Sequence, residues 1–550
     1  MSGHGSKPLR GLTSTGQSGI GVAKFGRMFR WLQPCFKTVG PNDERDVSEL
    51  LAALSGLMVA SEFRDKVEKA TADELADPQF TTDTPLTQAE PDDENPTIPA
   101  GYTYLGQFID HDTTFDPASS LQQQNDPDAL EDFRTPRLDL DSVYGRGPSD
   151  QPYLYDKGTG RSKFILGGNR GTGGTDRPDL QRTADGTALI GDKRNDENKI
   201  VAQIQALFLK FHNKVFDKLA QRFGSDQDDE RFLEAQRIVR WCYQWIVLHD
   251  FLPHVCGKRV VEDIMPTAKK RTPNLQFYAP HGGDAYIPVE FSVAAYRFGH
   301  SMVRPSYALN NTAKSTAIFT TDTRSAPFSR IPVFVFKATQ STDAMNGFGE
   351  FAPQLPPDWG IDWAFFFGKL GGAAEGQPQI PQPSYRLDAT LVDPLGALPE
   401  FLAKGLGSPF ISLAFRNLQR GHSMGLPSGQ RVAQMMGAKV LSDDELWNKK
   451  NQRETVGDWP EGHSFYNANK KWLEAAAPLW YYILKEAEVR THGHHLGEVG
   501  ARIVGETLVG LVWFDHFSYL FQMPNWTPAD EKLTGLGNKL DMLELTNFVG

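Results

Sequence analysis

Apolar residues recur every three or four positions over long parts of the chain, the spacing that places them on one face of an α-helix. The clearest run predicts a helix over residues 200–219, with apolar positions at Ile200, Ile204, Leu207, Phe211, Val215 and Leu219. Acidic and capping residues stand directly before it at 196–198, where a helix start favours them. The same periodicity predicts helices over residues 230–252, 472–488 and 496–514.

Strand signals are few and short, and the apolar run at 331–336 is one of them. Because no strand–helix–strand pattern repeats, a nucleotide-binding α/β fold is not expected. Residues 76–100 and 167–185 are rich in Gly, Pro or charged residues and predict loops. We therefore expect a mainly α-helical protein with long loops, in which a basic Gly/Ser-rich arm at 1–45 precedes one large domain over 46–550.

Composition and charge narrow the classes of function. The 550 residues carry a formal net charge of −11, which argues against a general nucleic-acid binder, because such a protein needs a basic face. The first 42 residues are the exception, since they hold no acid but six basic residues: Lys7, Arg10, Lys24, Arg27, Arg30 and Lys37. The 35 Phe residues are ample for a large core, so global disorder is not expected.

The cysteines and the first residues bear on where the protein acts. Cys35, Cys242 and Cys256 are too few for a disulfide framework and form no CxxC pair for zinc. The N-terminal segment lacks the apolar stretch of a signal peptide, and no continuous membrane span is evident. These features predict a soluble, cytoplasmic protein, with export by a route that needs no such signal left open.

The segment GYTYLGQFIDHDTTFDP, residues 101–117, carries the first candidate chemistry. As a helix it would place Gln107 and His111 four positions apart on one face, with Asp110 beside them. Polar groups in an apolar segment are costly to bury unless they meet a ligand or one another. A helical histidine is more often a hydrogen-bonded structural residue than a catalyst, so this pattern alone leaves both interpretations open.

Four later segments matter for the same reason. RTPRLDLDSVYG at 134–145 could be a turn before a helix, although its alternating oxygen donors also suit a hard cation such as calcium. LIGDKRNDEN at 189–198 could be an ordinary charged helix start. FSVAAYRFGHSMVRP at 291–305 places a histidine in an apolar helix, where histidine is usually structural, and RNLQRGHSMGLP follows at 416–427.

Together, in this order and near this spacing, the five segments resemble the animal-type haem peroxidases of the peroxidase–cyclooxygenase superfamily, from about residue 80 to the C-terminus. The resemblance implies that His111 is the distal acid–base histidine and Gln107 the amide near it. Arg194 would be the distal arginine, a fixed cation that stabilises charge on the leaving hydroxide. Asp110 and Glu197 match the two acids that can form esters to haem methyl groups.

The same resemblance implies a calcium site beside the distal helix. It would be tied to the catalytic segment through Asp112, the neighbour of His111 in the sequence. The implied ligands are the side chains of Asp112, Thr135, Asp139 and Asp141, with the carbonyl of Arg137. Many relatives have serine in place of Asp141, so this site would be more acidic than theirs.

On the other side of the haem, the resemblance implies that His300 is the axial iron ligand. Asn417 would hydrogen-bond the imidazole of His300. Arg297 and Arg420 would pair with the haem propionates. The family pattern is broken after Arg420, where residues 422–424 read His-Ser-Met instead of Arg-Asp-His. This departure leaves the iron ligand in place but alters one wall of the site.

The function implied is that of an enzyme that binds haem b and calcium. It would use hydrogen peroxide to oxidise small donors such as halides, thiocyanate or phenols, through an oxoferryl intermediate. The resemblance implies neither a nucleic-acid partner nor an oligomeric state. The histidines His492, His494 and His495 lie outside the matched positions, and we interpret them as a surface turn.

Two other functions compete with this interpretation. One is a haem-dependent fatty-acid dioxygenase of the same superfamily, whose radical-forming tyrosine lies three residues before the proximal histidine. Arg297 occupies that position here, and Tyr296 should face away from the site that Arg297 addresses, since one helical residue turns by about 100°. The other is a non-catalytic haem- and calcium-binding adhesion or matrix protein, which gives no reason to keep His111, Arg194 and His300 together.

Overall fold

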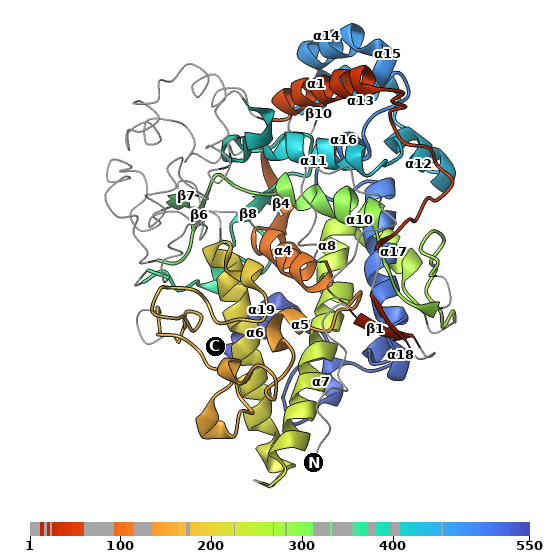
Figure 1. Ribbon diagram of the computed structural model, residues 1–550. Helices are drawn as coiled ribbons and strands as arrows, with labels where there is room; N and C mark the ends of the chain where they lie inside the picture. The colour runs from red at the N-terminus through yellow and green to blue at the C-terminus, as the bar shows by residue number, and fades with distance from the viewer. Residues whose placement is uncertain are drawn as a thin grey trace.

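The protein is described by a computed structural model in which helices dominate and the few strands form two-stranded pairs (Figure 1). This arrangement confirms the predicted mainly α-helical fold with few short strands. The residues that the structure describes are 12–15, 19–22, 25–59, 93–114, 135–171, 176–224, 226–267, 269–280, 283–311, 330–332, 355–356, 358–371, 380–396, 398, 408–452 and 455–550.

The helices and strands have the following bounds. The α-helices are α1 (Pro41–Leu57), α4 (Gly101–Thr113), α5 (Asp141–Tyr144), α6 (Lys199–Lys218), α7 (Asp228–Ile246), α8 (Leu252–Cys256), α9 (Lys258–Ile264), α10 (Val289–Val293), α11 (Leu413–Ser423), α12 (Gly429–Met436), α13 (Asp443–Trp447), α14 (Pro460–Ala468), α15 (Lys470–Leu473), α16 (Leu479–Thr491), α17 (Glu498–Trp513), α18 (Tyr519–Gln522) and α19 (Met542–Val549). The strand pairs are β1 (Leu12–Thr15) with β2 (Gly19–Val22), β3 (Phe25–Gly26) with β5 (Ile287–Pro288), β4 (Glu94–Pro99) with β8 (Pro383–Tyr385), β6 (Ser306–Ala308) with β7 (Arg330–Pro332), and β9 (Lys449–Gln452) with β10 (Thr455–Asp458).

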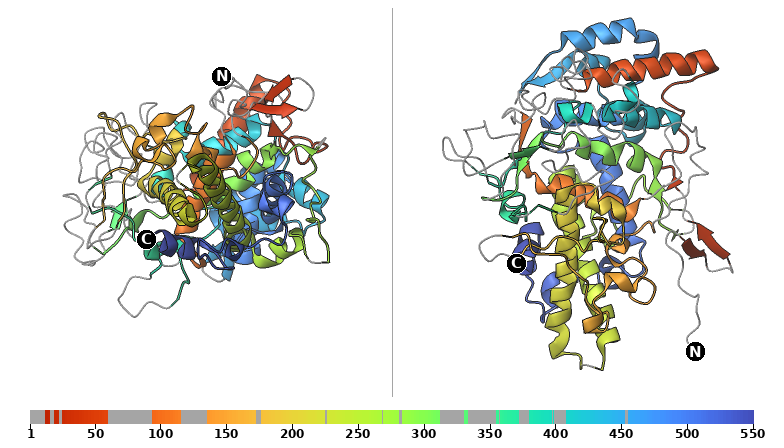
Figure 2. Two further views of the ribbon diagram at one scale, coloured as in Figure 1. Left: turned by 90° about the horizontal axis from the view of Figure 1, so that it is seen from below. Right: turned by 60° about the vertical axis from the view of Figure 1, so that its left-hand side comes forward.

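The predicted helix over 200–219 is present as α6, which packs along α7 at one end of the molecule (Figures 1 and 2). Its start is fixed by Asn198, whose side chain accepts hydrogen bonds from the backbone N–H groups of Ile200 and Val201. The apolar face of α6 meets α4, where the rings of Phe108 and Phe208 stack with centroids 4.9 Å apart. The distal helix α4 is thus held against the long helix.

The predicted helix over 230–252 is a composite of three parts. It begins as α7, widens into a π-helical turn at Val247–Phe251 and continues as α8. The widening fits Pro253, which lacks an N–H and whose ring would press on the carbonyl four residues back in a regular helix. Within this turn Asp250 accepts a 2.7 Å hydrogen bond from the hydroxyl of Tyr102, which anchors the start of α4.

The segment that ends at His300 differs from the predicted apolar helix. It consists of the short helix α10 followed by a 3₁₀-helix, η11 (Ala295–His300). The break falls at Ala294, whose φ of −128° and ψ of −71° lie outside the helical region. α16 packs on η11, so the proximal segment lies between the distal helix α4 and the C-terminal helices.

The structure differs from some of the other predicted elements in where they begin, and some of them lie partly outside the described residues. The helix expected over 472–488 begins at Leu479, because Pro478 has an extended ψ of 137° and starts the helix rather than lying within it. The helix over 496–514 is present as α17. Of the strand expected at 331–336, residues 333–336 lie outside the described residues. The loops expected at 76–100 and 167–185 are described only in part, and residues 94–99 form β4.

The later part of the basic N-terminal arm packs on the main body. Phe25, Phe29 and Phe36 are buried in the common core, and β3 pairs with β5 beside the proximal segment. The carboxylate of the fully buried Glu290 accepts the backbone N–H groups of Met28 and Phe29. Helix α1 begins at Pro41, so the expected boundary between residues 45 and 46 falls within a helix.

Among the described residues, no helix is long and apolar enough to cross a membrane.

A buried ion cluster fixes the turn that carries Arg194. The guanidinium of Arg182 forms bidentate hydrogen bonds with Asp179 at 3.1 Å and with Asp196 at 2.6 and 2.8 Å. The side chains of Arg182 and Asp179 are both 3% exposed. Asp196 ends the 3₁₀ turn η7 (Lys193–Asp196). Arg182 therefore joins the loop before η7 to the distal side of the molecule.

Replacing Arg182 with methionine should lower the free energy of unfolding by roughly 3–5 kcal/mol, because two buried carboxylates would lose their cation. Chemical denaturation monitored by circular dichroism would measure this change. Arg45→Ala is the control, since the Arg45 side chain is 67% exposed and its ion pair with Glu49 spans 3.9 Å. An Arg182→Met variant as stable as Arg45→Ala would show that the cluster adds nothing to stability.

Candidate active site

A cavity of about 650 Å³ opens between α4, η7 and η11. Its volume lies within the range of roughly 300–1,000 Å³ usual for small-molecule and cofactor sites. Segments more than 300 residues apart in the sequence meet there, such as those of Gln107 and Arg420. The side chains singled out by sequence that line this cavity are Gln107, Asp110, His111, Arg194, Glu197, Arg297, His300 and Arg420.

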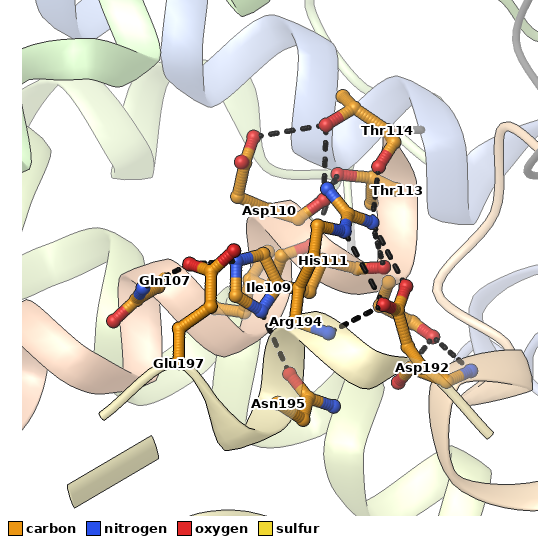
Figure 3. A network of polar contacts seen from close by, with 12 residues as sticks. Gln107, Ile109, Asp110, His111, Thr113, Thr114, Asp192, Arg194, Asn195 and Glu197 are labelled. Atoms are coloured by element: carbon orange, nitrogen blue, oxygen red, sulfur yellow. Dashed lines mark hydrogen bonds and ion pairs between the residues drawn. The ribbon is translucent and has the colours of Figure 1, made fainter. Parts of the chain in front are cut away.

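His111 is buried near the end of α4 and offers one ring nitrogen to the cavity. Its Nδ1 lies 2.8 Å from Oδ1 of Asn195, and its Nε2 lies 3.8 Å from a carboxylate oxygen of Glu197 (Figure 3). Burial, reinforced by the nearby Arg194 guanidinium, lowers the pKa of His111 to about 3. The imidazole is therefore neutral at pH 7, which is the form that a proton acceptor requires.

Gln107 and Glu197 form a polar group on the same side of the cavity. The amide nitrogen of Gln107 donates a 3.3 Å hydrogen bond to Glu197 (Figure 3). Its amide oxygen accepts one of 2.8 Å from Asn198. Asn198 is also the cap of α6, so this contact sets the position of Gln107 relative to the long helix. From the sequence, Asn198 was expected only as a capping residue at the start of the helix.

Arg194 lies at the C-terminal end of α4, where helix carbonyls lack partners within the helix. Its Nη2 donates to the backbone oxygens of His111 at 3.0 Å and Thr114 at 2.6 Å. The buried carboxylate of Asp192 accepts from Nη2 at 2.9 Å and from Nε at 3.3 Å. These bonds hold the cation in one orientation beside the distal histidine (Figure 3).

On the opposite wall, His300 is held by Asn417 from α11. The amide nitrogen of Asn417 lies 2.8 Å from Nδ1 of His300, and its amide oxygen accepts a 2.7 Å hydrogen bond from Arg297. Burial, reinforced by Arg297 and Arg416, lowers the pKa of His300 to about 3. The ring is thus neutral, as an iron ligand must be, and Nε2 is its remaining nitrogen for the cavity.

Arginines gather on this proximal side. Arg297, Arg416 and Arg420 all line the cavity. Burial, with added repulsion from Arg420 and Arg416, lowers the pKa of Arg297 to about 10, although Asp110 acts in the opposite direction. Neighbouring buried cations favour an anionic group between them. Arg416 was missed by the sequence analysis, although it directly precedes Asn417 in the segment singled out.

The expectation that Tyr296 faces away from the site was wrong. Tyr296 and Arg297 both line the cavity, because a space of this size borders more than one face of the short η11 helix. The Tyr296 ring stacks on Phe291 with centroids 4.5 Å apart. Its hydroxyl is buried and has no hydrogen-bond partner within the described part of the chain.

Three carboxylates converge behind the distal histidine. Ligand oxygens of Asp112, Asp139 and Asp141 all lie within 4.8 Å of one another, and Thr135 donates a 2.8 Å hydrogen bond to Asp139. Burial, then repulsion from Asp141, raises the pKa of Asp139 to about 6, and burial with its two neighbours raises that of Asp112. Arg137 lies in the same turn, where its N–H donates to the Thr135 carbonyl. The four predicted calcium-binding side chains are thus brought together.

The histidine group near the C-terminus is not the surface turn we expected. His492 ends α16 in a left-handed conformation, with φ 53°, and the turn packs beneath β4. The fully buried Asn95 donates to the carbonyl oxygens of Gly493 and His494, and Arg386 donates to that of His492. The turn is therefore half-buried and serves packing.

Asn195 is the functional contact that sequence reasoning missed most clearly. It follows Arg194 in a segment that reads as a charged helix start, where asparagine is expected as a capping residue. Nothing in the sequence relates it to His111, which lies 84 residues earlier.

Residues 120–358 match the family model described as animal haem peroxidase. This part of the chain is therefore similar to the animal haem peroxidases. The matched residues include the acidic turn, Arg194 and His300, whereas His111 lies just before them and Asn417 after them. The cavity therefore includes residues on both sides of the matched region.

The curated proteins that the chain matches are distant relatives. Human eosinophil peroxidase is 26% identical over 241 residues, which cover 44% of this chain and 28% of that protein. The Drosophila melanogaster chorion peroxidase is 26% identical over 262 residues, covering 46% and 27%. The Caenorhabditis elegans peroxidasin homolog pxn-2 is 24% identical over 241 residues, covering 44% and 15%. The chain thus spans less than a third of the length of each of these relatives.

Solved structures share the fold over most of the chain. Peroxidase A from Dictyostelium discoideum superposes with a TM-score of 0.57 at 13% identity, covering 96% of this chain and 93% of that one. A fatty acid alpha-dioxygenase from Arabidopsis thaliana gives a TM-score of 0.52 at 13% identity, covering 83% and 71%. At such identities the likeness establishes the fold and not the chemistry.

Proposed function

We propose that the protein is a haem peroxidase that uses hydrogen peroxide to oxidise small donors. The observation that carries the proposal is the cavity between His111 and His300. Each imidazole is neutral, each has an asparagine at Nδ1, and each lines the same space from an opposite segment. A purely structural pair of buried histidines would not need to share an open cavity.

The residues of the cavity fit haem b. His300 would hold the iron through Nε2, and the cluster formed by Arg297, Arg416 and Arg420 supplies cations for the two propionates. The depressed pKa of Arg297 supports this assignment, because an anion would relieve the repulsion between these arginines. When bound, the haem would supply the redox chemistry that no side chain here can perform.

On the distal side, His111 would act as acid and base at Nε2. It would take a proton from one oxygen of hydrogen peroxide and return it to the other oxygen as the O–O bond breaks. Arg194 would stabilise the negative charge that develops on the leaving oxygen, and its fixed orientation limits the cost of reorganisation. We propose halides, thiocyanate and phenols as the donors. Two electrons taken from the donor would reduce one hydrogen peroxide to two molecules of water.

Haem uptake would also reorganise the proximal hydrogen bonds. Iron ligation through Nε2 leaves the proton of His300 on Nδ1, which needs an acceptor. The amide nitrogen of Asn417 faces Nδ1 while Arg297 donates to its oxygen. We propose that Arg297 turns to a propionate, so that the amide of Asn417 can rotate and accept from Nδ1.

Substitutions at the two histidines should have different effects. His300→Ala should weaken haem retention, measured by the ratio of Soret to protein absorbance after gel filtration. His111→Ala should retain haem but slow the absorbance change after one equivalent of peroxide by about 10²–10⁴-fold, the range typical of a lost acid–base group.

His212→Gln is the matched control for these variants. His212 is fully buried like His111, but it bonds the Tyr144 hydroxyl and the Ser162 carbonyl and does not line the cavity. It should leave the peroxide reaction unchanged. If His111→Ala reacted with peroxide as fast as the wild type, the distal assignment would be wrong. A wild-type protein that binds haem but never reacts with peroxide would favour the non-catalytic haem-binding alternative.

We further propose that the acidic group at Asp112, Asp139 and Asp141 binds one calcium ion. Hard oxygen donors suit calcium, and the cation would offset the mutual repulsion of these buried carboxylates. Arg137 would contribute its carbonyl, and Thr135 its hydroxyl.

Calcium removal should therefore destabilise the protein. Elemental analysis should find about one calcium ion per chain, and chelation should lower the stability by roughly 2–3 kcal/mol relative to calcium at about 100 times its Kd. Asp139→Asn should reduce this calcium effect, whereas Asp150→Asn, at an exposed acid outside the group, should not. Active enzyme without bound calcium would contradict the proposal.

Asp110 and Glu197 are proposed to attach the haem covalently, since both carboxylates line the cavity. Each ester would join a carboxylate oxygen to a haem methyl carbon, with one hydrogen peroxide as the oxidant and two waters released. After turnover, acid–organic extraction should leave haem on the polypeptide. Asp110→Asn and Glu197→Gln should each remove one linkage by mass spectrometry. Complete extraction of haem from turned-over wild type would rule the esters out.

A haem-dependent fatty-acid dioxygenase is the second candidate, favoured by the position of Tyr296. Its buried hydroxyl faces no hydrogen-bond partner among the described residues, and its ring lines the cavity. The shared fold with an alpha-dioxygenase agrees with either activity. Arg297, which occupies the position of the family's radical tyrosine, favours the peroxidase.

An oxygen electrode separates these candidates. With linoleate or arachidonate and a trace of peroxide to prime a radical, we expect no oxygen uptake by the wild type. Rapid uptake that Tyr296→Phe abolishes would overturn the peroxidase assignment in favour of the dioxygenase.

A further inference from the structure

A chain of buried amide groups lies behind the distal histidine. Asn195 and Gln205 are both fully buried. The amide oxygen of Asn195 lies 2.8 Å from Nδ1 of His111, and the amide nitrogen of Asn195 donates a 2.7 Å hydrogen bond to the amide oxygen of Gln205. The amide nitrogen of Gln205 in turn lies 3.5 Å from the carbonyl oxygen of Ser142. The chain thus runs from the imidazole to a backbone acceptor (its first link is drawn in Figure 3).

The last group in this chain fixes the direction of every bond before it. A backbone carbonyl can only accept, so Gln205 must present its nitrogen to Ser142 and its oxygen to Asn195. Asn195 must then donate to Gln205 and present its own oxygen to His111. Because the amide oxygen of Asn195 can only accept a hydrogen bond, Nδ1 of His111 must carry the proton. The reverse order would place the oxygen of Gln205 against the oxygen of Ser142.

We propose that Asn195 and Gln205 are positioning residues that hold His111 in the tautomer with its proton on Nδ1, which leaves Nε2 unprotonated toward the cavity. This inference rests on the proposed peroxidase function, in which Nε2 receives the proton of hydrogen peroxide. The other tautomer would leave Nδ1 and the Asn195 oxygen as two buried acceptors facing each other, an arrangement that a dry interior disfavours.

The acceptor at the end of the chain is itself held in place. Ser142 belongs to α5, where its N–H and hydroxyl donate to the same carboxylate oxygen of Asp112 at 3.4 and 3.2 Å. On its other side lies Gly191, at which a Cβ atom would stand 2.4 Å from the Ser142 oxygen. The glycine lets the segment before η7 approach this carbonyl closely. The acidic group is therefore connected to His111 in two ways. Asp112 is the next residue in the sequence, and Ser142 joins Asp112 to the amide chain that ends at His111.

Cyanide binding to the ferric haem-loaded protein tests the tautomer apart from turnover, because hydrogen cyanide must give up its proton to bind iron. Stopped-flow absorbance should show cyanide association slowed about tenfold or more in Asn195→Leu. Asn195→Asp, which retains an acceptor at Nδ1 but loses the donor to Gln205, should be slowed clearly less than Asn195→Leu. Carbon monoxide binding to the dithionite-reduced protein needs no proton transfer and should be unchanged in both variants.

Two glutamines of α6 provide a matched pair for the second link. Gln205→Leu should also slow cyanide association, since the amide of Asn195 would lose its fixed direction. Gln203 is 5% exposed on the same helix and donates a 3.0 Å hydrogen bond to the Pro178 carbonyl, away from His111. Gln203→Leu should therefore bind cyanide at the wild-type rate.

The outcomes separate this inference from the function on which it rests. Wild-type cyanide rates in Asn195→Leu would overturn the positioning role, provided that the wild type itself reacts with peroxide. Equal slowing in Asn195→Leu, Asn195→Asp and Gln203→Leu would overturn it as well, because general damage to the fold would then explain the effect. A wild type that binds no haem would remove both the proposed function and this inference.

Discussion

A neutral imidazole buried against a cavity can serve as base or ligand only if its second nitrogen is satisfied by the protein. Both histidines of this site have an asparagine amide at Nδ1: the amide oxygen of Asn195 faces His111, and the amide nitrogen of Asn417 faces His300. The two amides differ in what holds them. Asn195 is fixed by a chain of amides that ends on a backbone carbonyl, whereas the partner of Asn417 is Arg297, a cation that a haem propionate could attract away. The protein alone thus holds the orientation of His111, whereas the hydrogen bonds of Asn417 and Arg297 beside His300 could change on haem binding.

Desolvation is the main cause of the pKa shifts of the basic side chains that line the cavity. Burial lowers the pKa of both histidines to about 3 and that of Arg297 to about 10, because a desolvated site disfavours cations. The guanidinium of Arg194 is bonded instead to Asp192 and to two carbonyls at the end of α4. The proximal arginines differ from Arg194 in that they repel one another, which makes their wall a natural place for the carboxylates of a cofactor.

The acidic turn at Asp139 and Asp141 connects stability with the site. Asp112 lies next to His111 in the sequence, and it also accepts from Ser142, the residue whose carbonyl ends the amide chain. The acidic group is therefore connected to His111 both by the peptide bond between His111 and Asp112 and by the hydrogen bonds through Ser142. A cation bound there would neutralise the turn and, at the same time, hold the acceptor on which the tautomer of His111 depends.

The sequence by itself determined the helical class, the long helix α6 and the segments that supply both histidines, because apolar periodicity and short motifs are local properties of the chain. It also indicated the side chains proposed to bind calcium, which lie close together along the chain apart from Asp112. Tertiary structure alone decided that Tyr296 lines the cavity, that η11 is a 3₁₀ turn, and that the His492 turn is half-buried. It alone brought Asn195 to His111 across 84 residues. Hydrogen-bond direction in a buried network depends on which acceptor ends it, and that acceptor, the Ser142 carbonyl, is a backbone group that no side-chain pattern can reveal.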